Sequence, residues 1–228
     1  MTTWNSEWAT LKDSRGQQIA RILRESDSDI IVLTEGCRAL LPSDGYVIEG
    51  SEDWGYVSKD RDRRKVILWS RHPITEHDTI GHPELPTGRF VSGNITVLSK
   101  HIHVIGVCIP WSGAHVRTGR RDREPWQDHN TYLGYLEQIV RSRPQPLMIA
   151  GDFNQRIPRR HQPLDSYELL VAAFRQMNIH TIGITEPAFI DHIATSKSLK
   201  ASDLKKISKE QHDAKLSDHD GVTITLVF

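Results

Sequence analysis

Short apolar runs alternate with longer amphipathic segments along the chain, and this alternation predicts strands interleaved with helices. Three segments place apolar residues at helical spacing, and the predicted helices are therefore residues 11–26, 128–141 and 167–177. Shorter runs rich in β-branched residues predict buried strands. These strands cover residues 29–34, 65–70, 90–98, 101–109, 146–150, 188–194 and 222–228.

The connections between the predicted strands indicate a mixed sheet system with helices on its outside. Residues 90–98 and 101–109 are close enough in sequence to form a hairpin, whereas other strands are joined through a predicted helix. No repeat, low-complexity tract or linker divides the sequence, so residues 1–228 are expected to form one domain. Two long polar loops, 75–89 and 112–127, are candidates for substrate contacts.

Charge and cysteine content limit which cellular compartment and which binding partners the sequence supports. The 29 basic and 29 acidic residues give a formal net charge of zero, so a nucleic-acid partner has to be argued from local clusters. Cys37 and Cys108 lack metal-ligand spacing and favour free thiols in a reducing compartment. The N-terminus shows no signal-peptide pattern and no apolar run reaches membrane-spanning length. We therefore expect a cytoplasmic protein without a membrane span.

Polar side chains stand at or near the ends of four predicted strands. They are Glu35 after 29–34, Asp152 and Asn154 after 146–150, Asp191 within 188–194, and Asp218 with His219 before the last strand. Each has an ordinary structural explanation, such as an exposed or capping acid, an Asx-turn or a salt bridge. All four together, at the same kind of position, favour a metal-dependent centre that cleaves phosphate esters.

The residue types suit this reaction. Carboxylates hold hard divalent cations such as Mg²⁺ or Mn²⁺, which neutralise an anionic phosphate and stabilise the leaving oxygen. An aspartate can orient or deprotonate the attacking water, and an asparagine amide and a protonated histidine can donate hydrogen bonds to the transition state. A second aspartate beside the histidine sets its tautomer and raises its basicity.

Six short motifs resemble, in order, those of the endonuclease/exonuclease/phosphatase superfamily, the group of exonuclease III and deoxyribonuclease I. They are Thr3-Trp4-Asn5, the run 29–35, the run 66–74 with its Ser-Arg-His-Pro-Ile turn, Gly151-Asp152-Phe153-Asn154, Ile190-Asp191-His192-Ile193 and Ser217-Asp218-His219. Each motif alone is weak, but six in order across nearly the whole chain are specific. The resemblance implies an α/β fold, a four-layer sandwich of two packed mixed β-sheets flanked by helices, with the site at one rim.

The resemblance also implies a metal site. It makes Glu35 the principal metal ligand, with Asn5 and Asp218 nearby, and it implies Mg²⁺ or Mn²⁺ as the cofactor. The family usually has glutamine before this glutamate, whereas this chain has Thr34. That change affects hydrogen bonding around the ligand and leaves the ligand itself in place.

The remaining matched residues would carry the chemistry. By resemblance, Asp152 positions or activates the nucleophilic water, and Asn154 contacts the phosphate. His219, oriented by Asp191, would stabilise the transition state or assist proton transfer.

The expected phosphate contact departs from the family pattern. Many nucleases of the family place a histidine or tyrosine just ahead of a proline, whereas this chain has Ile109 before Pro110. Trp111, His115 or an arginine of the following loop are the candidates to replace it.

Arginines near the expected rim suit phosphate oxygens because their forked donors match them. The substrate-binding candidates of this kind are Arg117, in the loop 112–127, and Arg156 and Arg159, just after the Asp-Asn motif. The ordinary alternative is that arginines interspersed with acids form solvated salt bridges.

These features lead to one main hypothesis and two alternatives. The main hypothesis is a divalent-metal-dependent hydrolase, a nuclease that cleaves phosphodiester bonds of nucleic acid. The first alternative is a phosphatase or phosphodiesterase of a small phosphorylated substrate such as a phosphoinositide, a lipid or a nucleotide. The second is a catalytically inactive binding module. Such a module would be expected to have lost the glutamate, the Asp-Asn pair or the histidine, and all of them are present.

Overall fold

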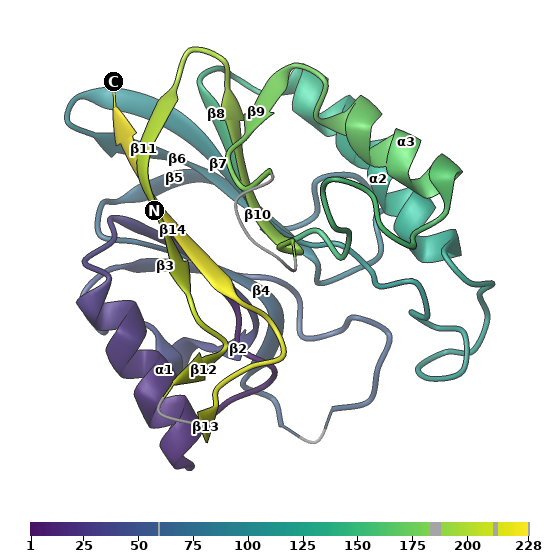
Figure 1. The fold of residues 1–228 in the computed structure, drawn as a ribbon, viewed down its shortest axis with the longest axis horizontal. Coiled ribbons are helices and arrows are strands. Elements are labelled where there is room, and N and C mark those ends of the chain that lie inside the picture. Colours follow the sequence, from purple (N-terminus) through teal and green to yellow (C-terminus); the bar gives the residue numbers. More distant parts are fainter. Residues whose placement is uncertain (59, 183–187, 212–213, 228) are drawn as a thin grey trace.

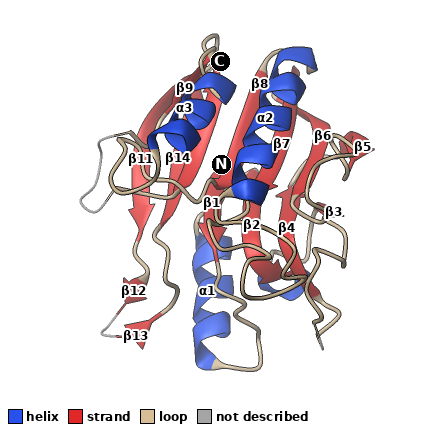
Figure 2. Cartoon of the chain, turned by 90° about the vertical axis from the view of Figure 1, so that its right-hand side faces the viewer, coloured by secondary structure: helices blue, strands red, loops and turns tan. Residues whose placement is uncertain are grey.

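The structure is a computed structural model that describes residues 1–58, 60–182, 188–211 and 214–227 (Figure 1). Within these residues, two six-stranded sheets pack face to face and helices cover their outer faces (Figure 2). The first sheet has the order β11-β14-β1-β2-β4-β3, and the second has the order β5-β6-β7-β8-β10-β9. This arrangement confirms the predicted α/β sandwich of two mixed sheets flanked by helices.

The elements have the following bounds. The strands of the first sheet are β1 Thr2–Asn5, β2 Ile30–Cys37, β3 Tyr46–Glu49, β4 Arg63–Ser70, β11 Lys200–Ile207 and β14 Gly221–Val227. The strands of the second sheet are β5 Ile74–Asp78, β6 Phe90–Val97, β7 Lys100–Cys108, β8 Leu147–Asp152, β9 Met177–Ile179 and β10 Asp191–Ser196. The helices are α1 Ser14–Glu25, α2 Gln127–Ser142 and α3 Leu164–Ala173, with a 3-10 turn η1 at Arg38–Leu40 and a small ribbon of β12 Glu210–Gln211 and β13 Ala214–Lys215.

The central strands are buried on both faces. In β2, Ile30 and Val32 belong to the core between the sheets, whereas Ile31 and Leu33 pack with residues of α1. Successive side chains of a strand point to opposite faces, so a strand covered on both sides needs an unbroken apolar run. That requirement explains why the runs 29–34 and 146–150 could be recognised as strands in the sequence.

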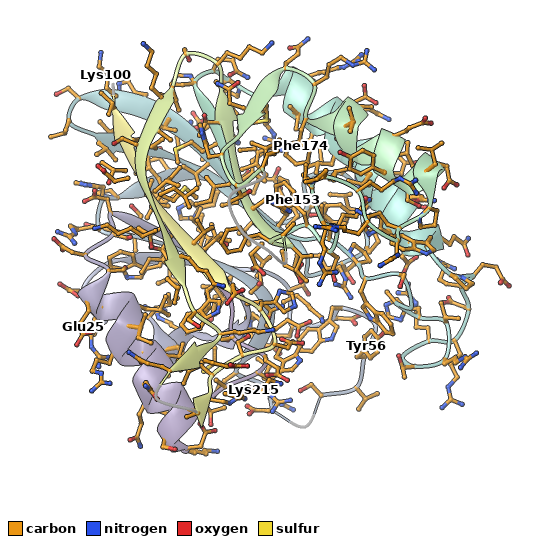
Figure 3. The ribbon with its side chains drawn as sticks, viewed as in Figure 1. Glu25, Tyr56, Lys100, Phe153, Phe174 and Lys215 are labelled. Carbon is orange, nitrogen blue, oxygen red and sulfur yellow. The ribbon has the colours of Figure 1, made fainter. Side chains whose placement is uncertain are left out.

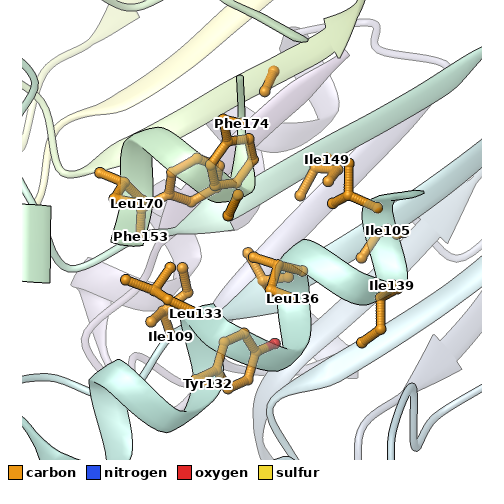
Figure 4. Close-up of a cluster of buried hydrophobic side chains, with 14 of the residues drawn as sticks. Ile105, Ile109, Tyr132, Leu133, Leu136, Ile139, Ile149, Phe153, Leu170 and Phe174 are labelled. Atoms are coloured by element: carbon orange, nitrogen blue, oxygen red, sulfur yellow. The ribbon is translucent and has the colours of Figure 1, made fainter. Parts of the chain in front are cut away.

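The outer helices pack through one apolar stripe each. Asp13 caps α1 by accepting a 2.7 Å hydrogen bond from the amide of Gly16, so this helix begins at Ser14 rather than at the predicted residue 11. The stripe of α2 is buried against α3 and the outer face of the second sheet (Figure 4). The largest members of this cluster include Tyr132, Phe153 and Phe174.

Two strand–helix–strand units and two returning strands bring distant segments to one rim of the sandwich. β1 runs parallel to β2, which follows it through α1, and β7 runs parallel to β8, which follows it through α2. β14 then pairs antiparallel with β1, and β10 pairs antiparallel with β8. The ends of β1 and β8 therefore lie beside the beginnings of β14 and β10, and these are the positions of the predicted catalytic residues.

The predicted element boundaries were wrong in several places. The helix expected at 167–177 is α3 at Leu164–Ala173, because the chain turns at Phe174 and enters β9. The strand expected at 188–194 begins only at Asp191, and part of the expected loop 75–89 is β5. Phe228, the end of the last predicted strand, lies outside the described residues. No helix among the described residues is long and apolar enough to cross a membrane.

Two buried histidines should make the fold sensitive to acid. Burial lowers the pKa of His129 and of His192 to about 4. Because these values lie below the value of about 6.5 for an exposed histidine, the unfolded chain binds protons first as the pH falls, and stability is lost between about pH 6.5 and 4. Each group contributes a slope of up to about 1.4 kcal/mol per pH unit in this window.

Urea unfolding of the wild type and of His129→Gln between pH 7 and 4 should show a shallower loss of stability in the variant. His101→Gln, which changes an exposed histidine, is the matched control and should keep the wild-type slope. Equal slopes for all three proteins would contradict the prediction.

Candidate active site

The register of β8 and β10 places two aspartates directly opposite each other. Asp152 is the last residue of β8, Asp191 is the first residue of β10, and the two are paired across the ladder. Gly151 precedes Asp152 with φ at 139°, and a Cβ at that position would lie 1.9 Å from the carbonyl oxygen of Val107. Only glycine permits this approach, which explains the glycine ahead of the aspartate.

Three hydrogen bonds orient the carboxylate of Asp152. Asn154 donates to it twice, from its backbone amide to Oδ1 and from Nδ2 to Oδ2, both at 2.8 Å. Asn5, at the end of β1, donates from Nδ2 to Oδ2 at 3.2 Å and thereby joins the two sheets. The second hydrogen of the Asn154 amide goes to the carbonyl oxygen of Ile109 at 2.9 Å. The amide of Asn154 therefore positions Asp152, and a phosphate contact from it would require one of these bonds to be exchanged.

A buried polar network holds the turn after Asp152. Asn154 has a left-handed φ of 52°, which asparagine tolerates better than most residues. Gln155 follows it, and its Nε2 donates to Nε2 of His129 at 2.7 Å. The carbonyl oxygen of Gln155 accepts a 2.9 Å bond from Nε2 of His192. These bonds fix the backbone on the far side of the turn and so fix the direction of Asp152.

His219 lies against Asp191 across the interface between the sheets. Nδ1 of His219 donates to Oδ2 of Asp191 at 2.5 Å, and Asp191 is completely buried. The backbone of His219 is tied to β1 because its carbonyl oxygen accepts a 2.9 Å bond from Nε1 of Trp4. With Nδ1 engaged, Nε2 is the ring nitrogen that remains for chemistry, and it lies 3.7 Å from Oδ1 of Asp218.

Burial and charge interactions together raise the pKa values of Asp152 and His219. Burial alone lowers the pKa of His219, but the carboxylates of Asp191 and Asp152 outweigh it and raise the pKa to about 10. Burial raises the pKa of Asp152 to about 7; Asp191 and Glu35 add to the rise and His219 opposes it. His219 is therefore an imidazolium at neutral pH, a donor suited to developing negative charge.

Glu35 lies within β2, beside a buried cation. Its φ of 47° is left-handed, which is uncommon for a residue with this side chain and typical of functional positions. Lys65 of β4 donates from Nζ to Oε1 of Glu35 at 2.5 Å, and only 8% of the lysine side chain is exposed. Lys65 belongs to a basic cluster in the sequence, residues 59–65, but was not among the predicted site residues. Its ion pair with Glu35 became visible only through the register of β2 and β4.

The donor set fits a divalent cation. Ligand atoms of Asp152, Asp191 and His219 lie within 4.8 Å of one another. Oδ1 of Asp191 is buried and has no hydrogen-bond partner among the described residues. Carboxylate oxygens are the ligands that Mg²⁺ and Mn²⁺ take, so the two aspartates, rather than the protonated ring of His219, suit a cation here. Glu35 is near enough to raise the pKa of both aspartates, and Asp218 is near enough to raise that of Asp191.

The predicted substrate-binding residues fall into two groups. Trp111 is 47% exposed, and Arg117, Arg156 and Arg159 are exposed as well. Nη1 of Arg159 donates a hydrogen bond to the carbonyl oxygen of Gln162.

His115 is in the other group, because it is only 1% exposed. Its Nδ1 accepts from the amide of Arg120 at 3.2 Å, so the hydrogen lies on Nε2 and is donated to the carbonyl oxygen of Trp54 at 3.1 Å. The buried ring therefore holds the loops of Trp54 and Arg120 in place. Its position gives no support to the prediction that His115 contacts the substrate directly.

The site also includes a pocket that sequence reasoning missed. A cavity of about 670 Å³ opens beside Glu35, and aromatic rings from separate loops line it. Of these rings only Trp111 was predicted, while Trp8 and Trp54 were not. Neither sits in a recognisable pattern, so no signal in the sequence could have placed them together.

The family model of the endonuclease/exonuclease/phosphatase family matches residues 2–219. The chain belongs to this family. Membership confirms the resemblance that was inferred from the six motifs. It also supports the prediction of a phosphodiester hydrolase. No curated protein sequence matches the chain.

Solved structures share the fold at low identity. A D. rerio TDP2 humanized by 14 mutations has a TM-score of 0.72 and 15% identity, covering 100% of this chain and 98% of that chain. The 3′-5′ exonuclease NExo from Neisseria meningitidis has a TM-score of 0.70 and 18% identity, covering 100% and 99%. An AP endonuclease from Archaeoglobus fulgidus has a TM-score of 0.67 and 16% identity, covering 100% and 98%.

The bond between Asp191 and His219 can be tested through the titration of the histidine. In Asp191→Asn, the pKa of His219 should fall from about 10 toward the ordinary value of about 6.5, because the partner loses its charge. NMR titration of the ring of His219 in metal-free protein measures this value.

Asp218→Asn is the matched control. The side chain of Asp218 is 54% exposed and its Oδ1 lies 3.7 Å from Nε2 of His219, so water screens the interaction and the decrease should be smaller. A larger decrease in Asp218→Asn than in Asp191→Asn would contradict the assignment.

Proposed function

We propose that the protein is a divalent-metal-dependent nuclease that hydrolyses phosphodiester bonds of nucleic acid. The observation that supports this most strongly is the buried cluster of Asp152, Asp191 and His219, placed at one rim by strands from both sheets. A structural salt bridge would not require two buried aspartates opposite each other with an imidazolium between the sheets.

Each residue has a defined task in this proposal. Asp152, held by Asn5 and Asn154, orients the water that attacks phosphorus and accepts its proton. His219, held by Asp191, donates from Nε2 to the oxygen on which negative charge develops as the bond to the leaving oxygen breaks.

Glu35, with Asn5 and Asp218 nearby, would hold the cation, and Asp152 and Asp191 contribute negative charge close by. When bound, Mg²⁺ or Mn²⁺ supplies charge neutralisation of the phosphate and of the leaving oxygen. Lys65 forms an ion pair with Glu35, so the cation would share this carboxylate with the lysine.

Nucleic acid is the preferred substrate for two reasons. Arg117 in the loop after β7, and Arg156 and Arg159 just after the Asp-Asn motif, are exposed and can bind backbone phosphates. Structures with the same fold hold nucleic acid, namely D. rerio TDP2 with a single-strand DNA product and Neisseria NExo with a product DNA hairpin. We also propose a cytoplasmic location, which the free and buried state of Cys37 and Cys108 supports.

A small phosphoester is the second candidate substrate. The cavity of about 670 Å³ beside Glu35 has a volume typical of small-molecule sites. A substrate panel of single- and double-stranded DNA, RNA, p-nitrophenyl phosphate esters and a phosphoinositide distinguishes the two.

Removal of the proposed catalytic groups should abolish hydrolysis by the purified protein. Asp152→Ala and His219→Ala should each lower kcat/KM at least about 100-fold, because each removes a proton acceptor or donor at the reacting phosphate. EDTA should have the same effect, and added Mg²⁺ or Mn²⁺ should reverse it. Glu25→Ala, on the exposed face of α1, is the control and should keep full activity. Undiminished activity in both Asp152→Ala and His219→Ala would refute the proposal.

The arginines after the Asp-Asn motif should act on long substrates only. Arg156→Ala should raise KM for an oligonucleotide about fivefold, as expected for one phosphate contact, and should leave kcat and the hydrolysis of a p-nitrophenyl ester unchanged. Steady-state kinetics at two salt concentrations measure this effect. Arg21→Ala, which changes an exposed arginine of α1, is the matched control. A KM increase of the same size in both variants would show that overall charge, rather than a contact at the rim, is responsible.

A further inference from the structure

The pocket beside Glu35 is lined by aromatic rings from three parts of the chain. The rings belong to Trp8 after β1, Trp54 and Tyr56 between β3 and β4, and Trp111 after β7. Trp8 and Trp54 stack with ring centroids 5.4 Å apart and planes inclined by 20°. Figure 3 shows Tyr56 in the loop region at the lower right of the molecule. The pocket therefore offers the half-exposed ring of Trp111, with the stacked pair of Trp8 and Trp54 beside it, next to the proposed metal ligand.

The position of Trp8 is linked to that of Glu35. The backbone amide of Trp8 donates to the carbonyl oxygen of Glu35 at 2.7 Å, and Trp8 has a left-handed φ of 60°. Ser6 donates from Oγ to the same carbonyl oxygen at 2.9 Å. A strained conformation of this kind persists only where the surroundings hold it, and it is typical of ligand sites. The ring of Trp8 is therefore held at a fixed place relative to the metal ligand.

The opposite wall is held by the buried His115. Its Nε2 donates to the carbonyl oxygen of Trp54, its backbone amide donates to the hydroxyl of Tyr56 at 3.1 Å, and its ring lies 4.6 Å from that of Tyr56. Gly55, between the two aromatic residues, has a φ of 81°, and a Cβ there would lie 2.4 Å from Cε1 of His115. This packing keeps Trp54 and Tyr56 in place without help from a ligand.

Two cations complete the pocket and decide which ligands suit it. Nζ of Lys65 lies 4.8 Å from the centroid of the Trp8 ring, and the guanidinium carbon of Arg63 lies 5.4 Å from it. Each cation is paired with a carboxylate of the same lining, Lys65 with Glu35 and Arg63 with Asp60. Aromatic cages also bind quaternary ammonium groups, but here the Trp8 ring is already covered by Trp54 and by the two protein cations. Rings with adjacent cations instead suit a flat ring that carries a phosphate.

We propose that this pocket binds one unpaired nucleobase of the substrate, the base of a nucleotide next to the scissile phosphate, against the exposed ring of Trp111 and beside the stacked pair of Trp8 and Trp54. The proposal rests on the proposed function for the position of the scissile phosphate. The phosphate of that nucleotide lies toward Lys65 and Glu35, and the base lies toward Trp111. A base in a duplex is covered on both faces by its neighbours, so the pocket admits a base only after it leaves the stack. The enzyme should therefore prefer single-stranded ends or strands over intact duplex.

Binding of a mononucleotide tests the pocket without hydrolysis. In EDTA, adenosine 5′-monophosphate should quench tryptophan fluorescence to saturation, because three of the six tryptophans of the chain line the pocket. Ribose 5-phosphate and phosphocholine should bind at least about fivefold more weakly, since neither can stack on the rings. Trp111→Leu should raise Kd for the nucleotide about fivefold or more. Trp126→Leu, which changes a tryptophan outside the pocket lining, should leave Kd unchanged.

Three results would overturn the proposal. They are equal affinity for the nucleotide and for ribose 5-phosphate, tighter binding of phosphocholine than of the nucleotide, and an unchanged Kd in Trp111→Leu. Phosphocholine binding would assign the pocket to a choline-bearing phosphodiester instead.

Cleavage assays separate this proposal from the proposed function. A protein that binds the nucleotide through Trp111 but hydrolyses no nucleic acid would refute the nuclease and support the pocket. A protein that cleaves single strands and intact duplex equally well, with no effect of Trp111→Leu on KM for either, would support the nuclease and refute the pocket.

Discussion

The hydrogen bond between Asp191 and His219 crosses the boundary between the two sheets, and the chemistry of the protein depends on that boundary being fixed. Asp191 begins β10 of the second sheet, whereas His219 precedes β14 of the first. Asn5 and Asp152 form a second bond across the same boundary. A small shift of one sheet against the other would separate both pairs. The apolar core between the sheets, with residues such as Val32, therefore has a catalytic as well as a stabilising task.

Burial explains both the unusual protonation and the suitability for a cation. Carboxylates in a place that excludes water favour their neutral form, and a positive charge nearby opposes that preference. His219 opposes the rise in the pKa of Asp152 without cancelling it, and Lys65 forms an ion pair with Glu35. A divalent cation and an anionic phosphate would enter a site in which opposite charges are already arranged. This preorganisation lowers the reorganisation that a reaction would otherwise require.

In its proposed role, the aromatic pocket would add specificity to a site of the family's fold. Its walls are loops between strands, as is usual where one fold serves several substrates. The backbone bond between Trp8 and Glu35 joins the pocket to the proposed metal ligand. The buried ring of His115 gives the other wall its shape. A histidine expected at the surface thus acts through the two aromatic residues that it supports.

The sequence by itself predicted the sandwich and the residues proposed to carry the chemistry. Strands covered on both faces must be apolar throughout, and polar residues can follow them only where a strand reaches the rim, so Asp152 and Glu35 were visible from local pattern. Motif order then identified Asp191 and His219. Edge strands such as β3, β5 and β11 escaped prediction because one face or edge meets water and their runs are short or polar.

Tertiary structure alone decided the contacts between segments far apart in the chain. The pairing of Lys65 with Glu35 and the meeting of Trp8 with Trp54 depend on strand register and loop conformation, which local sequence does not encode. The same holds for the burial of His115, which a polar loop sequence gave no reason to expect.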